Sequence, residues 1–463
     1  MSQNNATKFL SESSAKSFDL HHREIIANNM DKYNVAFGRG KSRFHDLENS
    51  KIKANLIKWR AIENLDKHLV DFEYNFTKRG GHVIWANDAE EARQEIWKIM
   101  QAHNARSVIK SKSMATEEIE LNHFLEKKGI ETIESDLGEY IIQLLGHKPY
   151  HFVTPAMHLS LEEIAKLFHE KFDTPLDASA EELTMKAREL LRDKYTSADI
   201  GISGANFIIA DTGSIAITEN EGNARLTTSF PKVHIALVGM EKVVPTMQDL
   251  DLFWPLLASH GTGQNLTVYN TILSGPRATN ETDGPEEMYV ILLNNGRTKL
   301  LEKPEQRQGL YCIRCGACLN VCPIYQNIGG HTYQTTYQGP IGSLISPHMS
   351  GMKEFKHLSY ASSLCGKCTE VCPVGIDIQK MLLVNRRESV QDNLATPIEK
   401  KMWKGFAYFM KDRKWIDLFG GKFKNFVLNK FFKKAWGENR TLPELPKQSF
   451  AKQWKEQQKE ADK

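Results

Sequence analysis

All seven cysteines of this chain lie in two short segments that repeat one another. The first segment reads Cys312-Ile-Arg-Cys315-Gly-Ala-Cys318-Leu-Asn-Val-Cys322-Pro323, and the second repeats this spacing from Ser362 to Pro373, with serine at its first position. C-x2-C-x2-C-x3-C-P is the spacing of the cluster-binding loop of bacterial ferredoxins. Iron in such clusters prefers soft thiolate ligands, and a cysteine at every third position can place three of them around one cluster. The repeat therefore predicts a protein that carries electrons.

In ferredoxins with two clusters, the last cysteine of each loop binds the cluster of the other loop. Applied to this chain, the rule predicts two iron–sulfur clusters, expected to be 4Fe-4S. The ligands of cluster 1 would be Cys312, Cys315, Cys318 and Cys372, and those of cluster 2 would be Cys322, Cys365 and Cys368. Cluster 2 then lacks one thiolate. Its fourth ligand is left open between Ser362, Ser363, His331, water and no ligand at all, the last giving a 3Fe-4S cluster or a labile fourth iron.

Structural zinc and disulfide bonds are the other common uses of closely spaced cysteines. Structural zinc sites take four ligands, usually as two separated pairs of residues. Here three cysteines in the first segment, and two in the second, are followed by a further Cys-Pro. An odd number of cysteines in a chain without secretion signals disfavours disulfides. Iron–sulfur binding is the better interpretation of the spacing.

The length of 463 residues is enough for two or three domains, and the 41% hydrophobic content is that of an ordinary soluble protein. No apolar run is long enough for a transmembrane helix, and the N-terminal segment lacks the apolar core of a signal peptide. We therefore expect a cytoplasmic protein.

Four regions can be distinguished by pattern. Residues 1–80 are expected to be helical, and from residue 81 short apolar runs alternate with helical periods, which favours a parallel sheet covered by helices. Between residues 200 and 296 strands are expected to dominate, with only Asp249–Leu257 helical. The predicted domains are a helical segment (1–80), an α/β domain (81–300), an iron–sulfur domain (301–390) and a helical tail (391–463).

Two segments of the α/β region have the composition of a small-anion site. The first follows a predicted strand and opens a helix, where free N–H groups attract anions, and the second places glycines and a cation beside strand ends. The candidate residues are Lys110, Ser111, Lys112, Ser113, Gly213, Gly222, Asn223 and Arg225. Ordinary turn chemistry with a surface basic pair is the competing interpretation. No dinucleotide, nucleophile-elbow or zinc-protease motif is present, and no catalytic residue is predicted.

The C-terminal tail is basic and rich in aromatic residues. Residues 401–463 hold 16 Lys and Arg against 7 Asp and Glu, a charge of +9 (16 − 7), although the whole chain carries only +3. The segment 401–436 could pack on the cluster domain, dock on a partner, or contact a membrane surface as a peripheral anchor at the inner membrane. Packing or partner docking is the preferred interpretation. Nucleic acid is not expected as a partner, because no binding motif accompanies the charge.

Several longer stretches resemble a known family. They are Lys110–His123, Glu134–Leu145, Thr212–Met240, Gly275–Arg277, Asp283–Glu286 and Asn295–Arg297 in the α/β region, and Tyr360–Asp377 around the second cysteine segment. The α/β region resembles the LUD domain of lactate-utilization proteins. The whole arrangement, over roughly residues 20 to 450, is similar to their iron–sulfur subunits, the LutB or LldF family, which share the serine at position 362. Asn294 departs from the family, where an aspartate is expected.

The resemblance implies a fold and a function. The fold would be an α/β LUD domain of the NagB/CoA-transferase-like type, followed by an α-helical, ferredoxin-like domain with two clusters. The function would be electron transfer within a complex that oxidises L-lactate to pyruvate, with LutA-like and LutC-like subunits as partners. The alternatives are the iron–sulfur subunit of another 2-hydroxy-acid oxidising complex, of the glycolate type, and a redox-sensing LUD/iron–sulfur module.

Overall fold

A computed structural model describes residues 4–437 and 440–461 of the chain. It divides into two compact units, Met1–Ser389 and Val390–Lys463. The first unit contains both the α/β region and the cysteine segments, so every candidate site residue lies within it.

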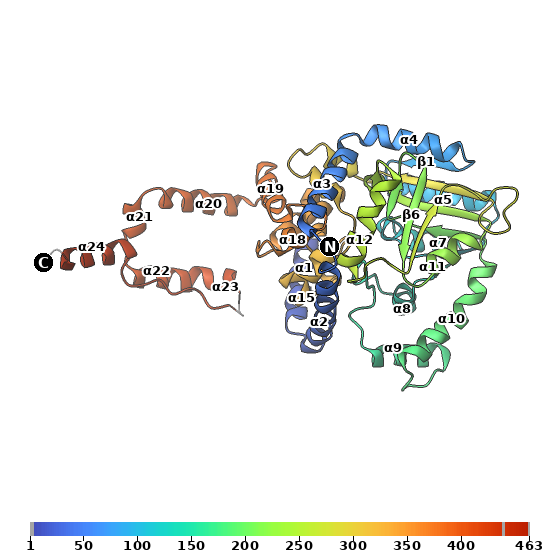
Figure 1. The fold of residues 1–463 in the computed structure, drawn as a ribbon. Coiled ribbons are helices and arrows are strands. Elements are labelled where there is room, and N and C mark those ends of the chain that lie inside the picture. The colour runs from blue at the N-terminus through green and yellow to red at the C-terminus, as the bar shows by residue number, and fades with distance from the viewer. Residues whose placement is uncertain (1–3, 438–439, 462–463) are drawn as a thin grey trace. The chain divides into compact units, whose positions relative to one another are not determined.

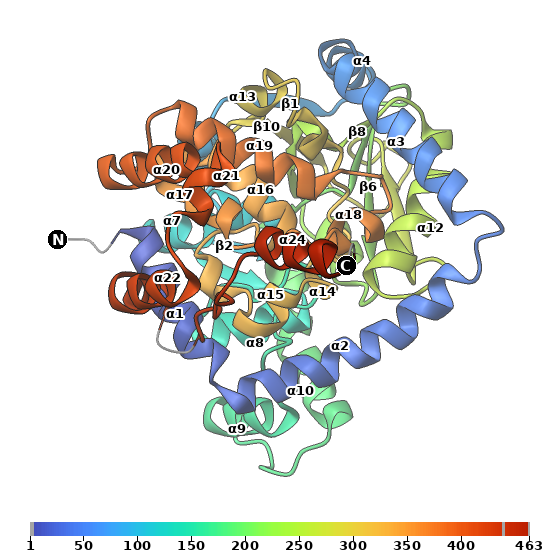
Figure 2. The ribbon, with the colours of Figure 1, turned by 90° about the vertical axis from the view of Figure 1, so that its left-hand side faces the viewer.

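Four helices precede the first strand: α1 (Asn5–Ser17), α2 (Leu20–Lys41), α3 (Leu47–Glu63) and α4 (Leu65–Thr77). Aspartates cap two of them, because the Asp19 carboxylate accepts the N–H of His22 at 3.1 Å and that of Asp46 accepts the N–H of Asn49 at 2.9 Å. These helices contact both the α/β region and the cluster region, and Figure 2 shows α1 and α2 beside α15 (Pro323–Ile328).

A six-stranded parallel sheet forms the centre of the α/β region (Figure 1). The order of its strands is β1-β10-β7-β4-β2-β3. Its strands are β1 (His82–Ala86), β2 (Ser107–Lys110), β3 (Glu131–Glu134), β4 (Ile200–Ser203), β7 (Val233–Gly239) and β10 (Glu287–Leu293). Every residue of β7 is buried, as expected for a central parallel strand covered on both faces. The mixed α/β fold class predicted from the sequence is confirmed.

Alternate side chains of the sheet enter different cores, because successive residues of a strand point to opposite faces. Ile235 and Leu237 pack with residues of α5 (Ala89–Ala102) and α7 (Leu121–Lys127). Ala236 and Val238 belong instead to the large core shared with the N-terminal helices and the cluster region. The cluster region is therefore packed onto one face of the LUD-like sheet without a separate core.

A second sheet, β8-β5-β6-β9, lies beside the first and contributes to the same large core. Its strands are β5 (Phe207–Ile209), β6 (Ser214–Glu219), β8 (Val243–Val244) and β9 (Tyr269–Leu273). The expectation of a single helix in this part of the chain is wrong. Asn223–Ser229 forms α11 as well as the expected helix, which is α12 (Leu250–Gly261), because Gly222 adopts a left-handed φ of 78° and turns the chain into a helix.

The remaining helices of the first unit complete the α/β region and enclose the cysteine segments. They are α6 (Met114–Glu118), α8 (Leu137–Leu145), α9 (Leu161–Phe172), α10 (Ala180–Ser197), α13 (Arg297–Leu301), α14 (Ala317–Asn320), α16 (Gly339–Met349), α17 (Met352–Tyr360), α18 (Lys367–Val371) and α19 (Ile378–Gln391).

The second unit consists of helices whose apolar side chains are exposed. They are α20 (Pro397–Met410), α21 (Arg413–Asp417), α22 (Gly421–Val427), α23 (Lys433–Trp436) and α24 (Phe450–Ala461). Among its described residues only Gly421 is buried, and Trp403, Phe406 and Phe426 are each more than half exposed. No helix within residues 4–437 and 440–461 is both long and apolar enough to cross a bilayer.

Candidate iron–sulfur site and adjoining cavity

The two cysteine segments fold into loops of the same local conformation. Arg314 and Leu364, two residues after the first position of each loop, both adopt left-handed φ angles, 61° and 56°. Gly316 and Gly366 follow with φ of 80° and 84°, and each caps the short helix that carries the next cysteine, α14 or α18. The sequence repeat is therefore also a structural repeat.

Ser362 occupies in its loop the place that Cys312 occupies in the first. The backbone N–H of Arg314 donates to the Cys312 sulfur at 3.4 Å, and the N–H of Leu364 donates to the Ser362 hydroxyl oxygen at 3.1 Å. The two side chains thus receive the same backbone contact, with oxygen in place of sulfur.

Four cysteines line one small apolar cavity, and they come from both loops. Isoleucines and Val374 form much of the remaining wall, and the cysteines are Cys312, Cys315, Cys318 and Cys372. Burial raises the pKa of Cys372 to about 12, and the nearby Cys312 adds to the rise. Uncharged thiols are favoured there until a cationic centre stabilises the thiolates, which is what iron would do. This set is the one predicted for cluster 1.

The other three cysteines form a second group. Burial and the neighbouring Cys322 and Cys365 raise the pKa of Cys368 to about 11, and burial together with Cys365 raises that of Cys322. Cys365 is exposed. This set is the one predicted for cluster 2, and it lies nearer to the surface than the first.

A tight single-ion site is not found: in the described part of the chain, no three Cys, His, Asp or Glu side chains converge to hold one metal ion. A multi-iron cluster does not need such convergence, because each thiolate binds its own iron atom. The donor chemistry and the grouping of the thiols fit iron–sulfur clusters.

The open fourth ligand of cluster 2 can be compared among its candidates. Ser362 lies at the ligand position of its loop, whereas the neighbouring Ser363 is exposed. His331 is engaged elsewhere, because its Nε2 lies 2.8 Å from the Lys148 carbonyl oxygen and its ring packs 4.9 Å from that of His158. Local geometry favours Ser362.

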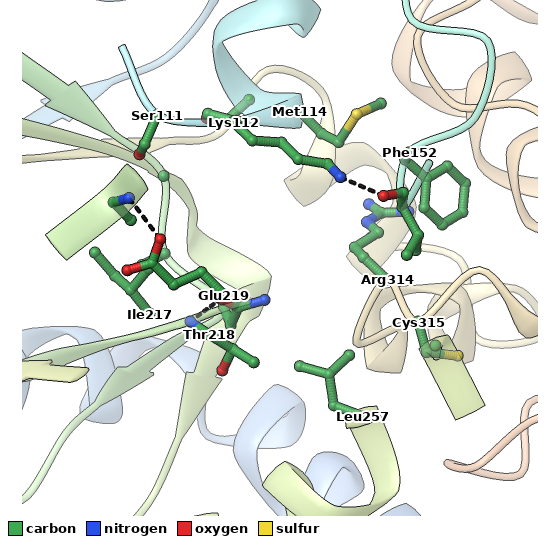
Figure 3. Close-up of a pocket in the computed structure, with 18 of the residues that line it drawn as sticks. Ser111, Lys112, Met114, Phe152, Ile217, Thr218, Glu219, Leu257, Arg314 and Cys315 are labelled. Carbon is green, nitrogen blue, oxygen red and sulfur yellow. Dashed lines mark hydrogen bonds between the residues drawn. The ribbon is translucent and has the colours of Figure 1, made fainter. Parts of the chain in front are cut away.

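A larger cavity, of about 380 Å³, lies at the carboxyl ends of the parallel strands (Figure 3). The ends of three strands and the segments after them form much of its wall: 111–115 after β2, 204–206 after β4, and Gly239, Glu241 and Lys242 at the end of β7 and after it. Chain connections leave β2 and β4 towards opposite edges of the sheet, so the cavity contains a topological switch point, where ligands bind in open α/β folds.

Half of the residues predicted for a small-anion site line this cavity, and half do not. Ser111, Lys112, Ser113 and Asn223 line the cavity; Lys110, Gly213, Gly222 and Arg225 are not among its lining residues. Lys110 is buried and forms ion pairs with Glu134 at 2.7 Å and Glu117 at 3.1 Å. Gly213 serves close packing, because a Cβ there would lie 2.3 Å from the backbone nitrogen of Phe76.

A buried network of ion pairs on the cavity wall was not predicted from the sequence. Arg297 donates to Glu118 through Nη1 and Nη2, each at 2.8 Å, and through Nε to Glu241. Glu241 also pairs with Arg314 at 3.3 Å, and the Tyr337 hydroxyl donates to Glu118 at 2.6 Å. The network joins the LUD-like sheet to the first cysteine loop.

Asn294, which departs from the expected family pattern, has a local structural role. Its side-chain oxygen accepts the backbone N–H of Thr298 at 3.0 Å and the Thr298 hydroxyl at 3.1 Å. An amide oxygen can make these bonds as a carboxylate would, so the substitution preserves the start of α13.

Acidic groups occupy another part of the large cavity. Glu219 accepts the N–H groups of Ala224 at 2.6 Å and Arg225 at 2.8 Å. Burial and the nearby Asp136 raise the pKa of Glu221 to about 7. The cavity therefore offers carboxyl groups as well as the cations Lys112, Lys242 and Arg314.

The two cavities adjoin. Cys315 and Phe152 line both the large cavity and the cysteine cavity, so a single layer of side chains separates their contents. A ligand in the large cavity would lie against the predicted cluster 1.

Two family descriptions match the chain. Residues 69–293 match the LUD domain, and residues 308–376 match the 4Fe-4S dicluster domain. The second match covers all seven cysteines and supports 4Fe-4S clusters as the cofactor.

Three curated relatives illustrate the similarity over most of the chain. Lactate utilization protein B of Geobacillus sp. (strain WCH70) is 41% identical over 451 residues, which cover 92% of this chain and 95% of the relative. The protein of that name from Bacillus subtilis (strain 168) is 44% identical over 378 residues, covering 80% and 79%. An uncharacterized electron transport protein, YkgF, of Escherichia coli (strain K12) is 42% identical over 386 residues, covering 83% and 81%. The chain therefore belongs to the lactate utilization protein B family.

Proposed function

We propose that this chain is the iron–sulfur electron-transfer subunit of a complex that oxidises L-lactate to pyruvate. The observation that carries the proposal is the grouping of Cys372, from the second loop, with Cys312, Cys315 and Cys318 around one cavity. This grouping supports the crossed ligation of two-cluster ferredoxins. The names of the relatives supply the substrate.

Each set of cysteines would hold one cluster. Cluster 1 would be bound by Cys312, Cys315, Cys318 and Cys372, and cluster 2 by Cys322, Cys365 and Cys368. When bound, such clusters accept and release one electron at a time. The protein's contribution is to set their surroundings. Ile313, Ile341 and Ile376 keep water from the first group, and the N–H of Arg314 donates to the Cys312 sulfur. A hydrogen bond to a ligand sulfur raises the reduction potential of a cluster, and burial opposes added negative charge.

The fourth ligand of cluster 2 is assigned here to Ser362. We expect Ser362→Ala to convert cluster 2 to a 3Fe-4S form, because no other side chain takes the position equivalent to Cys312. Electron paramagnetic resonance of the oxidised protein would show the three-iron signal. Ser363→Ala is the matched control and should leave the spectrum unchanged, since that side chain is exposed. An unaltered spectrum in Ser362→Ala would exclude the assignment.

LutA-like and LutC-like subunits are the proposed partners, and the exposed aromatic and basic helices of the second unit are the proposed docking surface. Exposed Trp and Phe side chains with lysines between them suit a protein interface or an anionic membrane surface. Loss of the partners from a pull-down after removal of residues 397–461 would support a protein interface. Retained partners, with lost sedimentation on anionic vesicles, would support peripheral binding at the inner membrane.

The direct test of the function is electron paramagnetic resonance on the anaerobically isolated complex, before and after addition of L-lactate. New signals of reduced clusters are expected with L-lactate. Signals that arise with dithionite but not with lactate would show intact clusters fed by a different donor, and would contradict the proposed substrate.

A further inference from the structure

The large cavity has a built cationic wall next to the first cysteine group. Arg314 and Lys242 both line this cavity, and neither lines the cysteine cavity. Figure 3 shows the Lys112 ammonium and the Arg314 guanidinium on the side of Cys315, with Glu219 across the cavity.

Arg314 has hydrogen-bond donors that the protein does not satisfy. Its side chain is only 9% exposed, packs on the Tyr337 ring with 4.1 Å between guanidinium carbon and ring centroid, and pairs once with Glu241. Its Nε and Nη1 are buried without a hydrogen-bond partner. Arg297, by contrast, donates through all three nitrogens. Buried unpaired N–H groups of a cation are costly, so they point to an acceptor that binds from outside.

Lys242 is a second unpaired cation on this wall. No hydrogen bond or ion pair is formed by its ammonium with the residues that the structure describes, whereas the nearby Lys58 donates to the Glu241 and Val243 carbonyls. Three cations that line this wall (Lys242, Arg297 and Arg314) accompany two carboxylates (Glu118 and Glu241), a local surplus of one positive charge (3 − 2). A surplus of this sign favours an anionic ligand.

The opposite side of the cavity offers hydrogen-bonding groups of another kind. Glu219 lies there, and Glu221, Asn206 and the apolar side chains of Leu257 and Met114 also line the cavity. A ligand suited to both sides has a carboxylate at one end and a hydroxyl or carbonyl oxygen close to it, on a short carbon chain. This is the chemistry of 2-hydroxy and 2-oxo acids.

We propose that the large cavity binds a small 2-hydroxy or 2-oxo acid, with its carboxylate on Arg314 and Lys242, separated from the first cysteine group by the wall that contains Cys315. The inference rests on the proposed function for the choice of acid, and it assigns to this chain a ligand site that the electron-transfer role does not require. The volume leaves room for water beside the acid.

The test uses the full chain, purified anaerobically with its iron, and the probes L-lactate and pyruvate. Isothermal titration calorimetry should show binding of at least one probe, weakened about tenfold or more in Arg314→Gln and in Lys242→Gln, because each removes a charged donor to the carboxylate. Arg387→Gln is the matched control: this exposed arginine pairs with Glu305 and should leave the dissociation constant unchanged. Ligand addition should also alter the paramagnetic signal of the reduced protein in the wild type and not in the variants.

Iron content is measured in every sample. If Arg314→Gln loses iron, Lys242→Gln alone tests the effect on ligand binding, because Lys242 lies outside the cysteine loop. Absence of binding in the iron-loaded wild type, or equal binding in iron-loaded Lys242→Gln, would overturn the inference. Reduction by lactate in the complete complex without binding to this chain would leave the electron-transfer function standing and the cavity assignment refuted. Binding without reduction in the complex would support the cavity assignment and refute the function.

Discussion

Replacing Cys318 with alanine is expected to abolish lactate-dependent electron transfer and to lower the iron content to roughly half, since one of two clusters would be lost. Cys318 is 9% exposed and lines the small cavity with three other cysteines, so no nearby side chain can take its place. Iron and sulfide analysis, together with the paramagnetic spectrum of the reduced protein, would measure the loss.

The crossed ligation gives this experiment a sharper form. Cys372→Ala, although in the second loop, should reproduce the spectrum of Cys318→Ala, because Cys372 lines the same cavity. Cys368→Ala should give a different spectrum, because Cys368 lies with Cys322 and Cys365. The exposed Lys367 supplies the control, and Lys367→Ala should keep both clusters. If Cys372→Ala instead matched Cys368→Ala, each loop would bind its own cluster and the proposed ligand sets would be wrong.

Replacing Glu241 with alanine is expected to lower the free energy of unfolding by about 3–5 kcal/mol, the usual cost of removing one partner from a buried ion pair. Its side chain is 1% exposed, and it pairs with both Arg297 and Arg314. Without it, two guanidinium groups in the interior lose a counter-charge. Chemical denaturation followed by circular dichroism would measure the change.

Glu286→Ala is the matched control, because Glu286 also pairs with two cations, Arg277 at 2.7 Å and Lys232 at 3.6 Å, but at the surface. Exposed pairs contribute little, so a change below about 1 kcal/mol is expected there. A loss at Glu241 no larger than that at Glu286 would show that the buried network does not stabilise the fold.

The pH dependence of stability supplies an independent check on Glu241. Burial alone would raise its pKa, but Arg297, Arg314 and Lys242 outweigh burial and lower it to about 2. A carboxyl group whose pKa is lowered in the folded state stabilises the protein at pH values above its pKa in the unfolded state, near 4.5. That contribution is lost as the pH falls towards 2. The wild type should therefore lose stability over this interval more steeply than Glu241→Gln.

Local features of the chain were open to prediction from sequence. The cysteine spacing was enough to predict iron–sulfur clusters, because three ligands of a cluster come from one short loop and their positions depend mostly on local backbone geometry. The match of residues 308–376 to the 4Fe-4S dicluster domain agrees with it. The parallel sheet was predictable for a similar reason, since a strand buried on both faces is a continuous apolar run.

The residues of the large cavity were harder to predict from the sequence. Lys110 looked like an anion ligand by its place after a strand, yet it is held by Glu134 and Glu117, and only the pairing of β2 with β3 brings Glu134 beside it. Arg314 looked like a spacer between two cysteines, although its guanidinium faces the LUD-like cavity.

By itself, then, the sequence determined the cofactor chemistry, the α/β class and the family, all of which depend on local spacing or on similarity along the chain. Only the tertiary structure decided that Arg297 meets Glu118 from 179 positions away, and that Cys315 forms a wall common to both cavities. The physical reason is that burial and long-range pairing decide which charged side chains are neutralised and which stay free for a ligand. No local pattern in the chain encodes that difference.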